Sequence, residues 1–575
     1  MLEPSLHGDL RVRPPERLRP SLPAAIEARI RSAAQRGPVV YAMRRTRLSW
    51  LELPALDRVL RRADLPRPRG EALAWLDGPP PTLPTDAHIV PLGLLWGAWP
   101  FRCAPGPLDR LLGDGEDPRL LRALASVLGP GGRVRALAGA PLDPAGWADR
   151  SWPELAGLLD AQIADLRRVA AGPTRPPASA FRARVLADPR VQASESGEER
   201  AAQARRLYAG LAADPIPRSM DASLRVIMIA MRRLFRGFEV DEAGIETLRA
   251  AAARGPLLLV PSHRSHADYL LILKLLIERD LAPPTVAAGQ NLAFFPLSHV
   301  LRTGNAFFVR RNQKLDGLYG AVLSAYLTRL LQQGQSVKIY LEGGRTRTGR
   351  VGEARLGLLS VAADAAVSGA APGLTIVPMS VGYERVPEAS TVTAELDGRP
   401  KRPEGLHSLV AAASLLWSRD DHGYVNIQVG EPVNVAAFLA AHGYVRPGQE
   451  PERKAAIAAL GAFAMERIRA ITAITPTALL AAALAEGPAG ADWTWDELIT
   501  RARALAAAAR TRGARLCTAG GPVDAAQSLE RAATLLAREG VLTVDGTGPI
   551  RRVRAVASRG VLLRYYANLA GSAPG

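Results

Sequence analysis

Short apolar runs alternate with helix-like segments through the middle of the chain. Between the runs, apolar positions recur at helical spacing over 267–279, 316–333 and 353–368. Buried strands that alternate with helices indicate βαβ units and a mostly parallel sheet. We therefore predict an α/β fold for residues 245–445, with a central, mostly parallel sheet and flanking helices. The predicted strands are LLLVP (257–261), TVAAG (285–289), AFFVR (306–310), SVKIYLEG (336–343), TIVPMSVGYE (375–384) and YVNIQVGEP (424–432).

The regions on either side of this domain are expected to be more helical. Before it, the pattern predicts a strand at 37–43, a Pro-rich linker at 66–84, an apolar strand or loop at 86–103, and helices at 50–63, 152–169, 198–211 and 224–238. After it, Ala- and Leu-rich helices are predicted at 452–473, 476–486, 494–511 and 524–538, followed by a strand-like piece at 561–566. The organisation we predict is a poorly ordered basic segment (1–35), an accessory domain (36–180), a helical segment (181–244), the α/β domain (245–445) and a mainly helical domain (446–575).

Composition excludes several classes of protein and leaves an excess of positive charge. The 575 residues are 48% hydrophobic and 22% charged, which is ordinary for a globular chain, and 52 Gly with 46 Pro exclude a coiled-coil rod. The net charge of +18 calls for an anionic partner, such as nucleic acid, an anionic membrane or a phosphorylated small molecule. With two cysteines, no apolar leader and no apolar run of about 18 residues, we expect a reducing compartment and no spanning helix.

The first α/β crossover, LLLVPSHRSHADYLLILKLL (257–276), carries the sharpest chemical signal. His263 follows the strand, and Asp268 falls in the first turn of the next helix, so the two can face each other across the corner. The carboxylate can then fix the imidazole tautomer and leave the other ring nitrogen as a base. The alternatives at this point are that His263 and His266 are capping or surface residues with Asp268 as a helix-dipole partner, or that the group binds metal.

Two basic loops and a proline follow at other predicted strand ends. Arg310 and Arg311 close the run AFFVRR, where they can bind a phosphate or remain a solvated strand end. The loop YLEGGRTRTGR (340–350) combines glycines with arginines but lacks the Lys-Ser/Thr pair of a P-loop, so a nucleotide site is disfavoured. Within it we expect Glu342 to pair with an arginine. Pro378 in IVPMSVGYE predicts a sheet edge, a bulge or a turn of the backbone toward a ligand.

Taken together, these blocks resemble the glycerophospholipid acyltransferase superfamily. The H-x4-D motif at 263–268, FFVRR, EGGRTRTGR and VPMSVGYE occur in order, and PSHRSHADYLL, AAGQNL and RLGLLS resemble the large bacterial glycerol-3-phosphate 1-O-acyltransferases and their dihydroxyacetone-phosphate relatives. The resemblance covers most of the chain from about residue 35. The chain departs from the family at Asn305, where glycine is usual, and at Thr346, where serine is usual.

The resemblance implies a role for each matching residue. His263 is the general base and Asp268 orients it. The acceptor, glycerol 3-phosphate, is bound by a group of residues in the second and third blocks: Arg310, Arg311, Glu342, Gly343, Arg345 and Thr346. Pro378 belongs to the acyl-donor side. No metal or cofactor is implied, because acyl-CoA or acyl carrier protein serves as a co-substrate.

The implied activity is transfer of a fatty acyl group to the sn-1 hydroxyl of glycerol 3-phosphate, the first step of phospholipid synthesis. The resemblance implies a peripheral enzyme on the cytoplasmic face of the cell membrane, where the remaining positive charge meets an anionic surface. The same chemistry on dihydroxyacetone phosphate or lysophosphatidate is an open alternative. A nucleic-acid-binding protein is a remote one, since aromatic residues make up only 5% of the chain and no nucleic-acid-binding signature is found.

Overall fold

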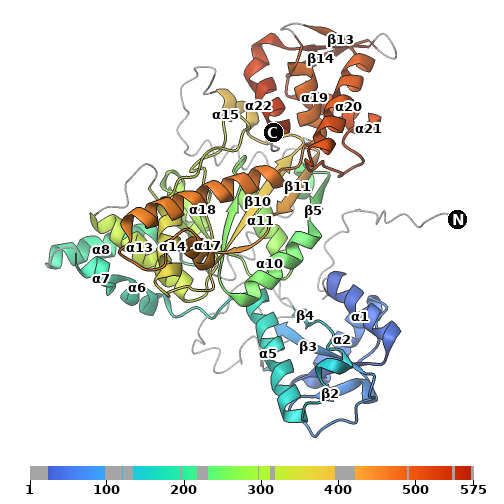
Figure 1. Ribbon diagram of the computed structural model, residues 1–575, viewed down its shortest axis with the longest axis vertical. Coiled ribbons are helices and arrows are strands. Elements are labelled where there is room, and N and C mark those ends of the chain that lie inside the picture. The colour runs from blue at the N-terminus through green and yellow to red at the C-terminus, as the bar shows by residue number, and fades with distance from the viewer. Residues whose placement is uncertain are drawn as a thin grey trace.

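Three β-sheets lie in a row along the long axis of the molecule (Figure 1). The N-terminal sheet lies at one end, the large central sheet in the middle, and the small C-terminal sheet with its helices at the other end. This computed structural model describes residues 22, 24–96, 119–120, 134–193, 197–216, 231–294, 297–310, 317–394, 396, 421–487, 491–546 and 551–571.

The N-terminal unit is a four-stranded sheet covered by helices. Its strands run in the order β2-β1-β3-β4, with β1 parallel to both neighbours and β4 antiparallel to β3. The helix α1 buries Ile26 and Ile30 against this sheet, so residues 24–35 are ordered although we expected 1–35 to be poorly ordered. The elements are α1 (Ala24–Arg36), β1 (Val39–Met43), α2 (Ser49–Arg62), β2 (Leu73–Trp75), β3 (His88–Trp96), β4 (Val134–Ala138) and α5 (Trp152–Ala171).

The central sheet has eight strands, and most of its neighbouring pairs are parallel. The order is β5-β11-β10-β6-β9-β7-β8, and β12 also pairs with β10. The run from β10 to β8 is parallel throughout, whereas β11 and β12 are antiparallel to β10. The prediction of a mostly parallel α/β fold is therefore confirmed. The strands are β5 (Gly237–Val240), β6 (Leu257–Pro261), β7 (Thr285–Gly289), β8 (Ala306–Val309), β9 (Val337–Lys338), β10 (Thr375–Tyr383), β11 (Tyr424–Val429) and β12 (Val433–Asn434).

Helices cover both faces of this sheet, because its middle strands are apolar on both sides. In β6, Leu257 and Leu259 join the hydrophobic cluster on one face, and Leu258 and Val260 join the cluster on the other. On the first face lie α10 (Glu242–Arg254) and α11 (Ala267–Glu278). On the second face lie α6 (Ala178–Leu186), α7 (Pro189–Gln192), α8 (Glu198–Leu211), α13 (Gly317–Gln332), α14 (Gly357–Val367), α17 (Val435–Ala441) and α18 (Glu450–Ile471).

The C-terminal unit is a helical bundle with a three-stranded sheet in the order β13-β15-β14. Its last described helix, α22, occupies the segment that we predicted as a strand. Apolar positions recur there at helical spacing, and Leu562, Tyr566 and Leu569 are all buried. The elements are α19 (Pro476–Ala485), β13 (Asp492–Thr494), α20 (Trp495–Thr511), α21 (Ala526–Arg538), β14 (Leu542–Asp545), β15 (Arg552–Ala555) and α22 (Gly560–Ala570).

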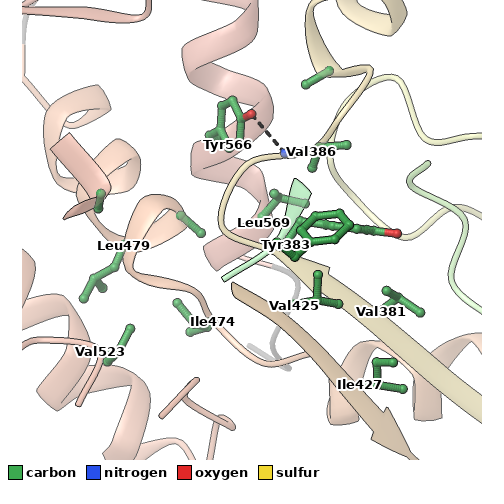
Figure 2. Close-up of a cluster of buried hydrophobic side chains, with 14 of the residues drawn as sticks. Val381, Tyr383, Val386, Val425, Ile427, Ile474, Leu479, Val523, Tyr566 and Leu569 are labelled. Atoms are coloured by element: carbon green, nitrogen blue, oxygen red, sulfur yellow. Dashed lines mark hydrogen bonds between the residues drawn. The ribbon is translucent and has the colours of Figure 1, made fainter. Parts of the chain in front are cut away.

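A continuous hydrophobic core joins this bundle to the central sheet. Val381 and Tyr383 of β10 lie in one cluster with Ile474 and with Leu569 of α22 (Figure 2). In the same region Val386 N donates to Tyr566 Oη at 3.3 Å. Two ion pairs, of Glu384 with Arg531 and of Arg385 with Glu539, continue the contact from the end of β10 to the bundle. The bundle and the sheet therefore share one packed interface.

Several sequence expectations are corrected in detail. The predicted linker 66–84 contains β2, which pairs with β1. The predicted helix 224–238 is described only from residue 231, and its end is strand β5. Because Met231, Leu234 and Phe235 are buried in the core, the apolar side of this described part is used inside the protein. The predicted domain boundaries stay predictions. In the part of the chain with described structure, no helix is both long enough and apolar enough to span a bilayer.

Candidate active site

The candidate site is built where β6 ends, at the carboxyl edge of the parallel strands. His263 lies two residues beyond β6, and Asp268 lies in the first turn of α11. The sharp connection between strand and helix brings His263 Nδ1 to 3.1 Å from Asp268 Oδ2. The His263 side chain is 10% exposed, and that of Asp268 is fully buried. The predicted contact between the two residues is thus present.

Asp268 is held by a full set of hydrogen-bond donors. Its Oδ2 also accepts from the backbone amides of Arg264 at 2.7 Å and Ser265 at 3.0 Å, and its Oδ1 accepts from the Tyr383 hydroxyl. Hydrogen bonds of this kind hold the carboxyl group in one orientation toward His263. The contact therefore favours the tautomer in which Nδ1 of His263 carries a proton and Nε2 is the basic nitrogen.

The imidazole of His263 is also fixed by ring stacking. Tyr340, which follows β9, stacks on it with ring centroids 3.9 Å apart and planes 21° apart. His266 occupies the N-cap position of α11 without a side-chain cap bond, so a capping role for His266 is not supported. The described part of the chain contains no group of three or more His, Cys, Asp or Glu side chains that could hold a metal ion.

Glu342 links the loop that carries His263 to the loop that follows β9. Its Oε1 accepts from the backbone amide of His263 at 2.9 Å, and its Oε2 accepts from that of Gly352 at 3.2 Å. We predicted an arginine as its partner; its hydrogen bonds come from backbone amides, and the positive charge of Arg264 acts on the carboxyl group as well. Burial raises the pKa of Glu342, while these two hydrogen bonds act in the opposite direction. The carboxyl group therefore positions the backbone of His263.

The glycine-rich loop 343–350 wraps closely around the same corner. Gly343 has a φ of +69°, a left-handed value that favours glycine, and a β-carbon there would force the side chain of Arg355 to move. Thr346 N donates to the carbonyl of His263 at 2.9 Å, and Thr346 Oγ1 donates to the carbonyl of Arg350 at 2.7 Å. The threonine hydroxyl keeps a hydrogen bond at the position where the family usually has serine.

The predicted arginines lie at different distances from His263. Arg345 lies in the loop beside His263, where its charge acts on the carboxyl group of Glu388. Arg310 stands at the same sheet edge but three strands from β6, which corresponds to about 14 Å at the usual strand spacing. Its guanidinium lies over the Tyr319 ring, 4.8 Å from the centroid. Arg311 lies outside the described residues.

Pro378 lies inside the sheet. It is buried in β10, in register with Val260 of β6, and β10 is paired on its other side with β11. Of the three alternatives, the sheet edge was therefore wrong, whereas a bulge is present: residues 377–378 of β10 lie opposite three residues, 430–432, between β11 and β12. The carbonyl of Pro378 accepts from Gly430 N at 2.8 Å, just beyond the end of β11. A proline is accommodated here because it lies near the point where pairing with β11 ends.

Asn305 supplies the backbone conformation that glycine would otherwise provide. Its φ is +72°, a left-handed value that asparagine tolerates better than most residues. The buried side chain also hydrogen-bonds to Thr285 Oγ1 at 3.2 Å and to the carbonyl of Pro284 at 3.0 Å. The turn into β8 is therefore maintained, and the side chain ties β8 to the start of β7.

Sequence reasoning missed three side chains that surround the pair formed by His263 and Asp268, which is called the dyad below. Tyr383 donates to Asp268 from the end of β10, and Glu388 Oε2 accepts from Ser265 Oγ at 2.5 Å. Lys338 of β9 is 1% exposed, with its Nζ 4.6 Å from the centroid of the Tyr269 ring. Tyr383 belongs to a motif that we had singled out. Lys338 could have been found as a lysine inside an apolar strand.

The class of protein follows from this fold and site together with the family models. Residues 239–382 match the model described as Acyltransferase, and this range contains β6, the dyad and the glycine-rich loop. Residues 393–570 match the model described as Glycerol-3-phosphate acyltransferase C-terminal region, which extends through α22.

Curated relatives give the family. The glycerol-3-phosphate acyltransferase of Pseudoalteromonas translucida is 30% identical over 455 residues, which are 70% of this chain and 55% of that protein. The protein of the same name from Glaesserella parasuis is 33% identical over 368 residues, 62% of this chain and 44% of that protein. This chain belongs to the glycerol-3-phosphate acyltransferase family, and it spans about half the length of the curated relatives it matches.

One solved structure is also similar. The crystal structure of the 1-acyl-sn-glycerophosphate (LPA) acyltransferase from Thermotoga maritima is 16% identical and covers 55% of this chain and 98% of that one. Its TM-score is 0.25, which is too low to support an argument about the fold.

Proposed function

We propose that this protein transfers a fatty acyl group from acyl-CoA or acyl carrier protein to the sn-1 hydroxyl of glycerol 3-phosphate, giving lysophosphatidic acid. The observation that carries the proposal is the buried His263–Asp268 dyad at the carboxyl edge of the sheet, beside a loop with Arg345 and Arg347. Membership of the family supports the choice of acceptor.

The proposed mechanism is direct transfer with a general base. Nε2 of His263 removes the proton from the hydroxyl of the acceptor as its oxygen attacks the thioester carbonyl. The tetrahedral intermediate collapses, the C–S bond breaks, and the thiolate of the donor leaves; the imidazolium of His263 gives its proton to this thiolate, which regenerates the base. The Asp268 carboxylate balances the positive charge that develops on the imidazole. A base of this kind contributes roughly 10²–10⁴-fold to the rate.

The acceptor phosphate is proposed to bind on the basic side of the same corner. Arg345 lies next to Thr346, whose backbone amide donates to the carbonyl of His263, and Arg310 and Arg311 are proposed to extend the site along the sheet edge. Glu342, Gly343 and Thr346 shape the loop. Pro378 is assigned to the acyl-donor side through its motif alone. No cofactor or metal is proposed to take part.

An acyl-transfer assay with glycerol 3-phosphate and each donor type tests the proposal. The His263→Ala variant is expected to lose at least about 100-fold in kcat. His266→Ala is the matched control, because it removes a neighbouring imidazole and leaves the dyad intact; its kcat is expected to change less than about threefold. Substantial activity of His263→Ala, or equal loss in both variants, would contradict the assignment of the base.

A panel of acceptors distinguishes the alternatives for the substrate. Glycerol 3-phosphate is expected to give the highest kcat/KM, with dihydroxyacetone phosphate and lysophosphatidate below it. The order reverses if the protein acts on one of those acceptors instead. Transfer to none of the three would contradict the proposed function.

The proposed location is the cytoplasmic face of the cell membrane, with peripheral attachment to anionic lipid. The net charge of +18 supports this, because basic residues close to an anionic bilayer contribute about 1 kcal/mol each. Co-sedimentation with vesicles containing anionic lipid is expected to exceed that with neutral vesicles and to weaken with salt. Salt-sensitive binding of DNA in place of vesicles would favour the nucleic-acid alternative.

A further inference from the structure

Helix α22 lies directly against the glycine-rich loop of the active site. Gly349 has a φ of +83°, and a β-carbon at this position would overlap the backbone carbonyl of Tyr565. The backbones of loop and helix are therefore in contact, and glycine is required for that contact. The helix is more than 200 residues away from the loop in the sequence.

Asn568, in the last turn of α22, makes this contact specific. Its Nδ2 donates to the carbonyl of Thr348 at 2.8 Å, and its Oδ1 accepts from Nε of Arg350 at 3.2 Å. The side-chain amide of Asn568 thus hydrogen-bonds to groups on both sides of Gly349, the carbonyl of Thr348 before it and the guanidinium of Arg350 after it. Alanine at this position would remove both hydrogen bonds at once.

The opposite side of the loop is bound to the catalytic histidine. Thr346 N donates to the carbonyl of His263, and Thr346 Oγ1 donates to the carbonyl of Arg350. A chain of contacts therefore runs from His263 through Thr346 and Arg350 to Asn568. Arg347 lies between these attachments, and Arg345 lies immediately before the first of them.

The helix itself is anchored to the central sheet. Its Tyr566 accepts from the backbone amide of Val386 just beyond β10, and Leu569 packs in the cluster with Tyr383 (Figure 2). Tyr383 in turn donates to Asp268. The same buried interface thus supports both Asp268 and α22, the helix that holds the glycine-rich loop.

We propose that Asn568 is a positioning residue that sets the affinity of the site for the phosphorylated acceptor. The inference rests on the proposed function, because it assigns the arginines of the loop to the acceptor phosphate. A loop with four glycines between 343 and 352 loses much conformational freedom when it binds a ligand. Asn568 restrains the loop before binding, so less freedom remains to be lost when the acceptor binds.

The test compares Asn568→Ala with Arg564→Ala. Arg564 is exposed on the same helix, and no contact with the loop is found for it among the described residues. Calorimetric binding of glycerol 3-phosphate is expected to weaken about tenfold in Asn568→Ala and less than about twofold in Arg564→Ala. In the transfer assay the KM for the acceptor is expected to rise similarly, while kcat and the KM for the acyl donor stay within about threefold.

Hydrogen exchange gives a readout that needs no activity. The backbone amides of residues 347–350 are expected to exchange faster in Asn568→Ala than in the wild type or in Arg564→Ala. Unchanged exchange, or unchanged affinity for glycerol 3-phosphate, overturns the inference. An equal rise in the KM of both substrates overturns it as well, because that result points to general damage to the fold.

These outcomes separate the inference from the function on which it rests. A wild-type protein that binds glycerol 3-phosphate but transfers no acyl group contradicts the proposed function and leaves the positioning role to be decided by the binding data. A wild-type protein that transfers the acyl group, with Asn568→Ala indistinguishable from it, overturns the positioning role alone. A wild-type protein that does not bind glycerol 3-phosphate overturns both.

Discussion

Lys338 lies behind the dyad in the sheet, and replacing it by methionine is predicted to stabilise the protein in a pH-dependent way. Its Nζ donates to the carbonyl of Tyr269 at 3.4 Å and lies 5.5 Å from the centroid of the Tyr340 ring. None of the ion pairs found among the described residues involves Lys338. A lysine that is 1% exposed is therefore held mainly among aromatic rings.

The size of the effect follows from the pKa. Burial lowers the pKa of Lys338 from an ordinary value of 10.5 to about 7, and the charge of Asp268 opposes part of this fall. A fall of that size corresponds to roughly 4–5 kcal/mol. Below about pH 7 the folded state carries the full cost of a buried charge, and above about pH 10.5 it carries none. Between these values the unfolded chain binds more protons, so the free energy of unfolding rises with pH.

Urea unfolding of Lys338→Met and wild type at several pH values measures this difference. At about pH 6.5 the variant is expected to be more stable by several kcal/mol, and the gap is expected to shrink toward zero by about pH 10. Groups that titrate in the same way in both proteins contribute equally to the two free energies of unfolding, so their contributions cancel in the difference. Lys454→Met, at an exposed position of α18, is the control and should show no such trend. A constant difference between pH 6.5 and 10, or a variant less stable than wild type at the lower pH, would refute the reasoning.

Three other substitutions test separate parts of the structure. Asp268→Asn is expected to lower kcat by roughly 10²–10⁴-fold, because an amide cannot accept from all the donors that hold the carboxylate; a loss below tenfold in steady-state kinetics would count against the dyad. Asn305→Ala is expected to cost about 1 kcal/mol more in unfolding free energy than Asn305→Gly, since only glycine relieves the left-handed φ; the reverse order in urea titrations would contradict this. Arg531→Met leaves the buried carboxylate of Glu384 without its ion-pair partner and is expected to destabilise by about 3–5 kcal/mol, whereas an unchanged urea midpoint would show that the pair contributes little.

Contacts that are local in sequence were predicted well. Six of the eight strands of the central sheet lie in apolar runs that the pattern predicted, although β9 is only Val337–Lys338 of the predicted 336–343, and β5 and β12 were missed. The contact between His263 and Asp268 spans only five residues. The helix α22 was missed because a short apolar run with two tyrosines fits a strand as well as a helix. The order of the strands in the sheet could not be predicted from the sequence. The distance of Arg310 from the dyad is therefore known only from the structure.

Partners far apart in sequence could not be predicted. Tyr383 reaches Asp268 across 115 residues, and Asn568 reaches the loop across 220. These pairings depend on how β10 and the C-terminal bundle pack, which no local pattern specifies. Glu342 illustrates the same limit, because the backbone amides that donate to it are brought together by two loops.

The attachment of α22 to the glycine-rich loop has a consequence for the order of assembly during synthesis. Domains generally fold as units while the chain leaves the ribosome, beginning with the N-terminal part. The dyad and the loop are synthesised well before Asn568, and β10 cannot acquire its Tyr566 and Leu569 contacts until α22 has emerged. A nascent chain that ends before residue 560 therefore contains every acyltransferase motif but lacks the helix that supports them, and its interface on β10 remains exposed to chaperones and proteases until translation has passed α22.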